Sequence, residues 1–88
     1  MEINSAIQLA SQYYQQGNLQ QAEIIYKEIL NLEPTNLNAI KNLSNILQDK
    51  GQIDEAIIYH QKAINLNPDD FGSYYNLADA FLEKVETE

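Results

Sequence analysis

The sequence of 88 residues contains no cysteine, one histidine, three glycines and two prolines. Without cysteine the chain can form no disulfide, no thiolate metal site and no cysteine nucleophile. Because His60 is the single histidine, the chain has no histidine pair to bind a metal, and a Ser-His-Asp set would have to use this one residue. Because the glycines are isolated at positions 17, 51 and 72, no glycine-rich phosphate loop occurs. We therefore expect no cofactor, no metal site and no enzymatic activity.

Basic residues are also scarce. Five lysines and arginines against thirteen acids give a net charge of -8, with no basic patch that would attract phosphate groups or anionic lipids. We expect neither nucleic acid nor membrane as a partner. No run approaches the roughly 18 apolar residues that span a bilayer, and residues 1–10 lack the pattern of a signal peptide. The expected location is the cytoplasm, and a hydrophobic content of 44% is enough for an ordinary core.

An internal repeat organises the chain. The segment YYQQGNLQQAEIIYKEILNLEP, residues 13–34, has the same length as LQDKGQIDEAIIYHQKAINLNP, residues 47–68, and has glycine and proline at the same positions. Matched residues lie 34 positions apart: Gly17 and Gly51, Ala22 and Ala56, Ile24 and Ile58, Asn31 and Asn65, Leu32 and Leu66, Pro34 and Pro68. Triplets continue the register: Leu9, Leu43 and Leu77; Ala6, Ile40 and Tyr74; Ala10, Ser44 and Ala78; Tyr13, Leu47 and Phe81. A period sustained over the whole chain indicates stacked structural units.

Within each period the apolar residues recur at intervals of three and four, which is typical of helices. Gly17 and Gly51 suit the left-handed conformation that ends a helix, and Pro34 and Pro68 stop the helices before them. The pattern predicts helices at 3–16, 19–32, 37–49, 53–66 and 71–85. Asp54 and Asp69 are candidates for caps or first-turn acids of the helices at 53–66 and 71–85.

The 34-residue unit is a helix-turn-helix. It has a leucine and a small residue in the first helix, glycine at the turn, alanine and an aromatic residue in the second helix, and a final proline. This pattern resembles the tetratricopeptide repeat (TPR). The resemblance implies an all-α fold, a right-handed α-solenoid of antiparallel helix pairs. Two full units would span 3–36 and 37–70, and 71–88 would be a partial third unit that acts as a capping helix.

The repeat also predicts how the helices pack. Ala22 and Ala56 are small enough to let paired helices approach closely, while Leu9, Leu43 and Leu77 would fill the space between units. His60 occupies the position of Tyr26 in the other unit, so we assign it a structural role. We expect the last helix to cover helix 53–66 with one set of residues: Tyr74, Leu77, Ala78 and Phe81. Tyr75 and Leu82 would remain on its outer side, where a second copy of the chain could bind.

In the TPR family the first helices of the units line a concave groove that binds extended segments. By the register, the candidate partner-binding residues are Gln8, Ser11, Tyr14, Asn38, Lys41, Asn42, Asn45, Tyr75, Asn76 and Asp79. Carboxamides dominate this set. Because each carboxamide offers both donors and an acceptor, the set suits the main chain of an extended peptide.

Two more specific resemblances compete for these residues. Gln8, Asn42 and Asn76 fall at one helical position per unit, similar to the asparagine ladder in the repeats of O-linked N-acetylglucosamine transferase. Lys41, Asn45 and Asn76 match the first three positions of the carboxylate clamp that binds the C-terminal tails of heat-shock chaperones. We favour the ladder, because the remaining basic residues of a clamp would lie in a following unit. The third interpretation is that these amides are ordinary solvated helix residues.

The sequence thus favours a non-catalytic protein-protein interaction module that binds a protein or an extended peptide. Two alternatives remain open. The chain could be an oligomerisation or assembly unit that forms a homo-oligomer through its exposed terminal helix. It could also be the repeat fragment of a longer protein, for example a glycosyltransferase or another enzyme.

Overall fold

In a computed structural model that describes residues 1–87, the chain forms five helices and no strand. The helices are α1 (Ile3–Gln15), α2 (Leu19–Leu32), α3 (Leu37–Asp49), α4 (Ile53–Leu66) and α5 (Phe71–Thr87). The predicted all-α fold is confirmed, and three of the helices have the predicted bounds. The predicted partial unit 71–88 also includes Glu88, which lies outside the described residues.

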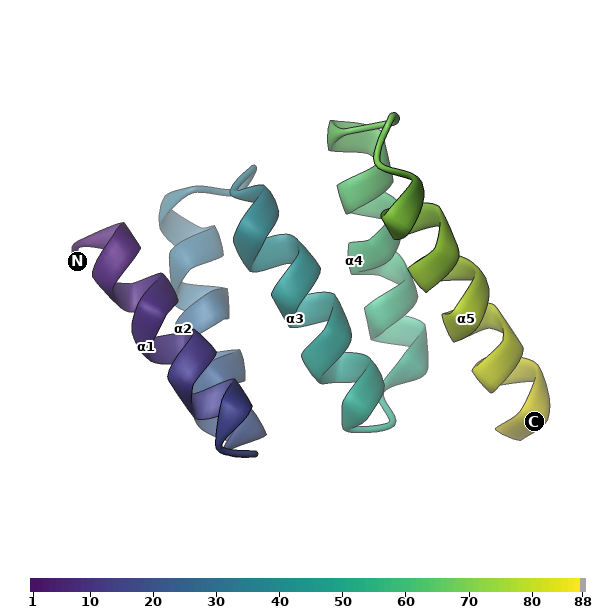
Figure 1. The fold of residues 1–88 in the computed structure, drawn as a ribbon, viewed down its shortest axis with the longest axis horizontal. Coiled ribbons are helices and arrows are strands. Elements are labelled where there is room, and N and C mark those ends of the chain that lie inside the picture. Colours follow the sequence, from purple (N-terminus) through teal and green to yellow (C-terminus); the bar gives the residue numbers. More distant parts are fainter. Residues whose placement is uncertain (88) are drawn as a thin grey trace.

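The helices are stacked in chain order as antiparallel pairs. Figure 1 shows α1, α3 and α5 roughly parallel on the near side, with α2 and α4 behind them. Each helix packs mainly on its neighbours along the chain. The result is a slab with principal extents of 38 × 28 × 18 Å. This arrangement places the first helix of every unit on one face of the molecule.

Glycine makes the turn inside each full unit. Gly17 and Gly51 both have φ of 81°, a region that side chains with a Cβ rarely adopt. The Gly17 N–H donates to the Tyr14 carbonyl at 3.0 Å, and the Asn18 N–H donates to the Tyr13 carbonyl at 2.8 Å. This pair of bonds is the Schellman motif, and Gly51 heads the same pair in the second unit.

Side chains cap the first helix of each unit. The Glu2 carboxylate accepts from the Asn4 and Ser5 N–H groups, and Asn36 Oδ1 accepts from the Ala39 N–H. Asp70 Oδ1 accepts from the Gly72 N–H at 3.1 Å at the start of α5. The expectation that Asp69 fills this role is therefore wrong. The residue directly before the helix has its carboxylate within reach of the free N–H groups, whereas Asp69 is one position too early.

The core is centred on α3, which is the middle helix and packs on α2 on one side and on α4 on the other. Leu43, Ile46 and Leu47 are completely buried there. Ala22 and Ala56 are also completely buried, as the close approach of paired helices requires. Most of the hydrophobic stabilisation therefore comes from the middle of the slab.

Two packing expectations fail at the ends of the slab. Leu9 is 45% exposed although its equivalent Leu43 is buried, because no helix precedes α1 in the described structure. On α5, Tyr74 and Phe81 are 44% and 45% exposed, Ala78 is exposed and Leu77 is only half-buried. The residues of α5 that are buried are Ser73 and Ala80.

Candidate functional site

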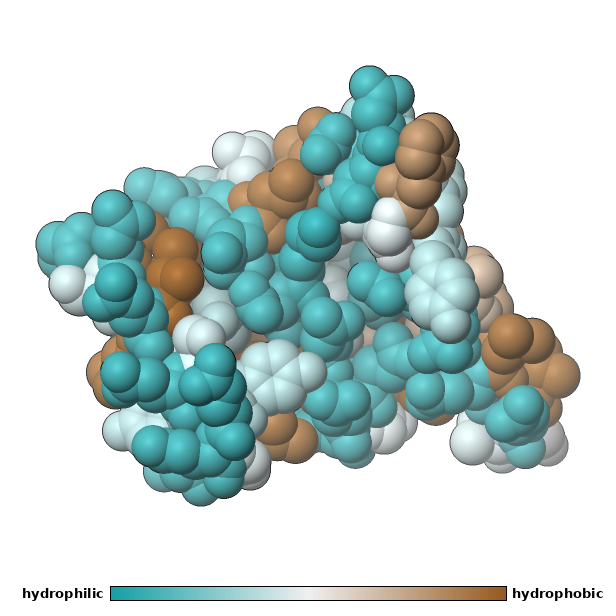
Figure 2. Space-filling view, in the orientation of Figure 1, coloured by the Kyte–Doolittle hydropathy of each residue, from teal (hydrophilic) through white to brown (hydrophobic). Residues whose placement is uncertain are grey.

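The surface formed by α1, α3 and α5, here called the first-helix face, contains the residues that the repeat register selected. Figure 2, in the orientation of Figure 1, shows that hydrophilic side chains cover most of this face. The second helices, α2 and α4, lie behind it. The face therefore has the position expected for the partner-binding surface of a helical repeat.

A phenol joins the first two helices of this face. The Tyr14 hydroxyl of α1 donates to Asp49 Oδ2 of α3 at 2.8 Å. Burial and this hydrogen bond raise the pKa of Tyr14 to about 12. Tyr14 is thus neutral and is oriented by its acceptor, Asp49.

One carboxamide connects three helices. Gln48 of α3 donates through Nε2 to Asp79 Oδ2 at 2.9 Å and to Glu83 Oε1 at 2.8 Å, both on α5. Its Oε1 lies 3.1 Å from Nε2 of His60 on α4. Because an amide oxygen only accepts, the imidazole donates from Nε2 and is held in one tautomer. Gln48 therefore fixes the position of α5 relative to α3 and α4.

His60 has the structural role that its register position predicted. Its side chain is 2% exposed and points to Gln48. Burial lowers the pKa of His60, against the opposing effect of the Asp79 charge. The histidine is therefore neutral at pH 7, and its Nε2 is already occupied by the carboxamide.

Ion pairs join the units. Lys41 Nζ of α3 lies 2.6 Å from Asp70 Oδ2 at the start of α5, and this hydrogen bond lowers the pKa of Asp70. Behind the first-helix face, Lys50 Nζ lies 2.6 Å from the buried Glu23 of α2. Although burial opposes ionisation, hydrogen bonds from Lys50 and Lys27 lower the pKa of Glu23. Lys41 and Lys50 therefore stabilise the stacking of neighbouring helices.

The predicted residues differ in how far the fold already uses them. Three are bonded to a neighbouring helix, namely Tyr14, Lys41 and Asp79. Asn42 Nδ2 donates to the carbonyl and the Oδ1 of Asn38, both at 2.8 Å, which leaves the Asn42 oxygen available. The side chains of five further candidates make no hydrogen bond within residues 1–87: Gln8, Ser11, Asn45, Tyr75 and Asn76.

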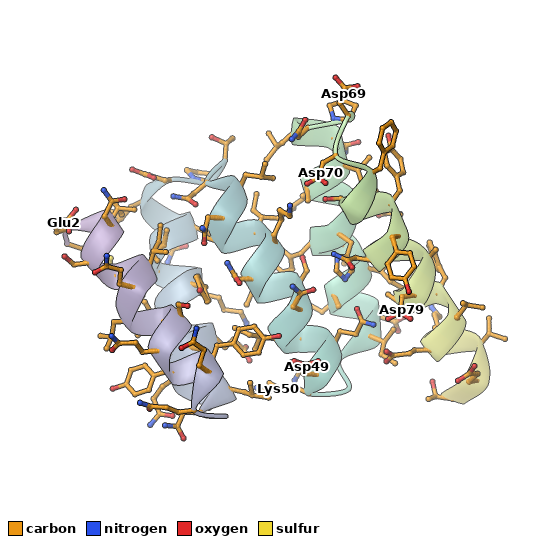
Figure 3. The ribbon with its side chains drawn as sticks, viewed as in Figure 1. Glu2, Asp49, Lys50, Asp69, Asp70 and Asp79 are labelled. Atoms are coloured by element: carbon orange, nitrogen blue, oxygen red, sulfur yellow. The ribbon has the colours of Figure 1, made fainter. Side chains whose placement is uncertain are left out.

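The lower end of the first-helix face is acidic. Figure 3 shows Asp49 on α3 and Asp79 on α5 in this part of the face, with Asp70 at the opposite end of α5. Asp49, Asp79 and Glu83 accept only from neutral donors, so their negative charges are not compensated there. At the other end, Lys41 is paired with Asp70. A ligand on this face would meet free carboxamides along its middle and negative charge at one end.

The main connection on this face is one that the candidate set omitted. Gln48 shares its register position with Tyr14 and Leu82, so the repeat marks it as facing the same surface, yet spacing alone does not reveal its three partners. Asp70 was likewise not recognised as the partner of Lys41, because it lies 29 residues away and outside the period. The signal that could have identified it is its place directly before a helix, where a carboxylate is held at a known position.

A shallow pocket of about 350 Å³ lies away from these residues. It is lined by Pro34, Thr35, Ile40, Lys62, Asn65 and Leu66, from the loop between α2 and α3, the start of α3 and the end of α4. None of the candidate partner-binding residues lines it. Among residues 1–87, no three histidine or acidic side chains are grouped as a metal site, and none of the helices is long and apolar enough to cross a membrane.

Two family models of tetratricopeptide repeats match parts of the chain. A family model described as TPR repeat matches residues 44–85, and a model described as Tetratricopeptide repeat matches residues 8–36. No curated protein sequence matches the chain. Two similar solved structures are the MamA protein, with a TM-score of 0.86 and 22% identity, and SycD, a type III secretion translocator chaperone of Yersinia enterocolitica, with a TM-score of 0.90 and 21% identity.

These structural similarities extend over nearly all of the chain but not of the other proteins. The matched region covers 92% of this chain and 44% of MamA, and 96% of this chain and 64% of SycD. The chain therefore spans less than two thirds of the length of either protein. At such low sequence identity, the likeness establishes the fold alone.

Proposed function

We propose that the chain, two parts of which match tetratricopeptide-repeat models, is a non-catalytic interaction module whose first-helix face binds an extended peptide segment of a partner protein. The observation that supports this function best is that some side chains on that face join the helices while others make no hydrogen bond. Tyr14 and Gln48 hold the three helices at fixed positions, while Asn45 and Asn76 keep unpaired carboxamides. Groups that are rigidly placed and unpaired bind a ligand at a low cost in entropy.

The ligand class follows from the hydrogen-bonding and charge of the face. Carboxamides on α3 and α5 can donate to a peptide carbonyl and accept from a peptide N–H, which recognises main chain without regard to sequence. The uncompensated Asp49, Asp79 and Glu83 favour lysine or arginine near one end of that segment. The proposed partner is therefore an extended segment with basic side chains.

The same contacts favour one of the two family resemblances. A carboxylate clamp needs a free cation, but Lys41 is paired with Asp70 at 2.6 Å. A carboxylate ligand would have to displace Asp70 and would meet three further acids on the face. A ladder of amides requires no cation, and Asn42 and Asn76 retain acceptor capacity for it. We therefore assign recognition to the amides rather than to a clamp.

The proposed absence of catalysis rests on what the titratable groups already do. His60 is buried and its Nε2 is bonded to Gln48, so this nitrogen is already occupied. Tyr14 has its pKa raised to about 12, far from a value useful for proton transfer at neutral pH. The SycD structure is described as a translocator chaperone, a role in which one protein binds another, and this supports the same class of function here.

The test is binding to an array of basic, neutral and acidic peptides of equal length. We expect the basic peptides to bind best. Replacing both Asn45 and Asn76 by alanine should weaken binding about tenfold, since two hydrogen bonds contribute roughly 1 kcal/mol or less each in net terms. Asn31→Ala on the exposed end of α2 is the matched control and should leave affinity unchanged. A preference for acidic peptides, or equal affinity of the double variant and the control, would contradict the proposal.

A further inference from the structure

Helix α5 carries an apolar surface that the fold leaves uncovered. Phe71, Tyr75, Leu82 and Val85 are 79%, 74%, 62% and 73% exposed, and Ala78 between them is exposed as well. These five residues, here called the α5 stripe, are flanked on one side by Tyr74 and Phe81. In Figure 2 hydrophobic side chains gather at the lower right, over the C-terminal half of α5.

The stripe is one continuous face of the helix. Its members follow one another at spacings of four, three, four and three residues. With 3.6 residues per turn, the stripe and its two flanking aromatics fall within an arc of about 120°. Ser73 and Ala80, which are buried against the rest of the slab, lie on the opposite side of the helix. The alternating spacing is that of a seam between two packed helices.

A further repeat helix would cover this face only in part. In the full units, the positions equivalent to Tyr74, Ala78 and Phe81 are Ile40, Ser44 and Leu47, which are buried between α3 and its neighbours. The positions equivalent to Tyr75 and Leu82 in the second unit are Lys41 and Gln48, which are polar and bonded on the first-helix face. In the first unit they are Ile7 and Tyr14, which are partly buried against the core. Tyr75 and Leu82 differ from both pairs in being largely exposed.

The stripe is complementary to itself. A two-fold axis through Ala78 that pairs two α5 helices in antiparallel orientation brings Phe71 opposite Val85 of the second copy, and Tyr75 beside Phe81 and Leu82 of the second copy. Apolar residues then face apolar residues on both sides of the axis, and alanine faces alanine at the centre. Such an isologous arrangement is what a symmetric dimer requires.

The exposed area is sufficient for such a dimer. Phe71, Tyr75, Tyr74 and Phe81 are 79%, 74%, 44% and 45% exposed. At roughly 200 Å² per aromatic side chain, these fractions leave about 500 Å² on each copy, or about 1,000 Å² for two. Leu82 and Val85 add to this value. The sum reaches the roughly 1,000 Å² that a specific interface between proteins needs.

We propose that a second copy of the chain covers the α5 stripe, and that the two copies pair through antiparallel α5 helices around Ala78. Tyr75 is the one candidate partner-binding residue that belongs to the stripe, whereas Asn45 and Asn76, the amides on which the proposed function relies, are not part of it. The net charge of -8 on each copy opposes association. The dimer is therefore expected to tighten as salt screens this repulsion.

Sedimentation equilibrium of the 88-residue chain from micromolar to millimolar concentration tests the proposal. We expect the mass to approach twice that of one chain, and Leu82→Glu to raise the dissociation constant at least about tenfold. Ile58→Glu changes a 53% exposed side chain on α4 in the same way and should leave the mass unchanged. Circular dichroism of each variant verifies that its helices are intact. A wild-type chain that remains a monomer throughout, or equal effects of both variants, overturns the proposal.

The register is tested by cross-linking. Because the chain has no cysteine, Ala78→Cys introduces a single thiol at the proposed axis, where two copies would oxidise to a disulfide-linked dimer. Ile24→Cys on α2 is the control and should remain monomeric at the same concentration. A dimer in solution that Ala78→Cys cannot cross-link overturns the proposed axis. A monomeric chain that binds a peptide copied from residues 53–66 shows that a further repeat helix covers the stripe, and this result also overturns the proposal.

Discussion

Replacing Tyr26 by phenylalanine is expected to stabilise the protein. The Tyr26 side chain is completely buried in the core, and its hydroxyl has no hydrogen-bond partner within the described residues. Burial raises the pKa of Tyr26, as expected for a phenol that is kept from water. An unpaired buried polar group costs about 1–3 kcal/mol, and phenylalanine fills nearly the same volume without that cost.

We expect Tyr26→Phe to raise the free energy of unfolding by about 1 kcal/mol, the lower end of that range, because loss of the oxygen leaves a small void. For a domain of this size, the change corresponds to an increase in Tm of about 4–8 °C. Urea unfolding followed by circular dichroism measures it. The midpoint should rise while the dependence on urea stays the same, because the area exposed on unfolding is nearly unchanged.

The equivalent position in the second unit provides the control. His60 has a partner in Gln48, so His60→Phe should lower the free energy of unfolding by about 1 kcal/mol. The same replacement residue at equivalent positions is thus expected to have effects of opposite sign. A loss of 1 kcal/mol or more in Tyr26→Phe would refute the reasoning, because it would mean that the hydroxyl makes a favourable bond in solution.

Two further predictions concern pH. The pKa of the buried Glu23 is lowered in the folded chain, so its contribution is present above the ordinary value of 4.5 and is lost as the pH falls through the folded-state pKa. Glu23→Gln should therefore be less stable than the wild type by about 2 kcal/mol at pH 7, and the difference should shrink as the pH falls below 4.5, as measured by urea midpoints over this range. A constant difference would contradict this. Tyr14, whose pKa is raised to about 12, contributes stability that is present below its ordinary value of 10.0 and lost as the pH rises through 12. Ultraviolet titration should show late phenolate ionisation that is smaller by one tyrosine in Tyr14→Phe, since the buried Tyr26 remains, and part of which is shifted to lower pH in Asp49→Asn. An unchanged titration curve in Asp49→Asn would show that the bond to Asp49 does not contribute.

The helices could be predicted from the sequence almost to the residue because strong local signals mark their ends. Gly17 and Gly51 adopt a conformation that other residues avoid, and Pro34 and Pro68 prevent the preceding helices from continuing. The structural role of His60 was also predictable, because its counterpart Tyr26 occupies an obvious core position.

The failures have one physical origin, which is that a repeat register shows which residues are equivalent but not which neighbours each of them has. Leu43 is buried because helices lie on both sides of α3, whereas Leu9 has a helix on one side only. Tyr74 and Phe81 are exposed for the corresponding reason at the other end.

The candidate site was predictable as a face but not as a set of contacts. Register places residues on the first-helix face, and the structure adds which of them the fold has already paired. The bond from Gln48 to Asp79 depends on side-chain reach between α3 and α5, and the Lys41 pair depends on where the cap residue Asp70 places its carboxylate. Neither can be deduced from spacing. The roles of the free amides Asn45 and Asn76 in binding remain a prediction.

The stacking of each helix mainly on its chain neighbours also determines how the protein folds. Contacts that are close in sequence form with little loss of loop entropy, so we expect folding to be fast. The interior of the slab should exchange its amide hydrogens last, since α3 has six buried residues while α1 has one and α5 has two. A peptide lying across α1, α3 and α5 would connect the units that fray first to the one that is most protected. Its binding energy would then appear as increased cooperativity of unfolding, with the terminal helices gaining most of the protection.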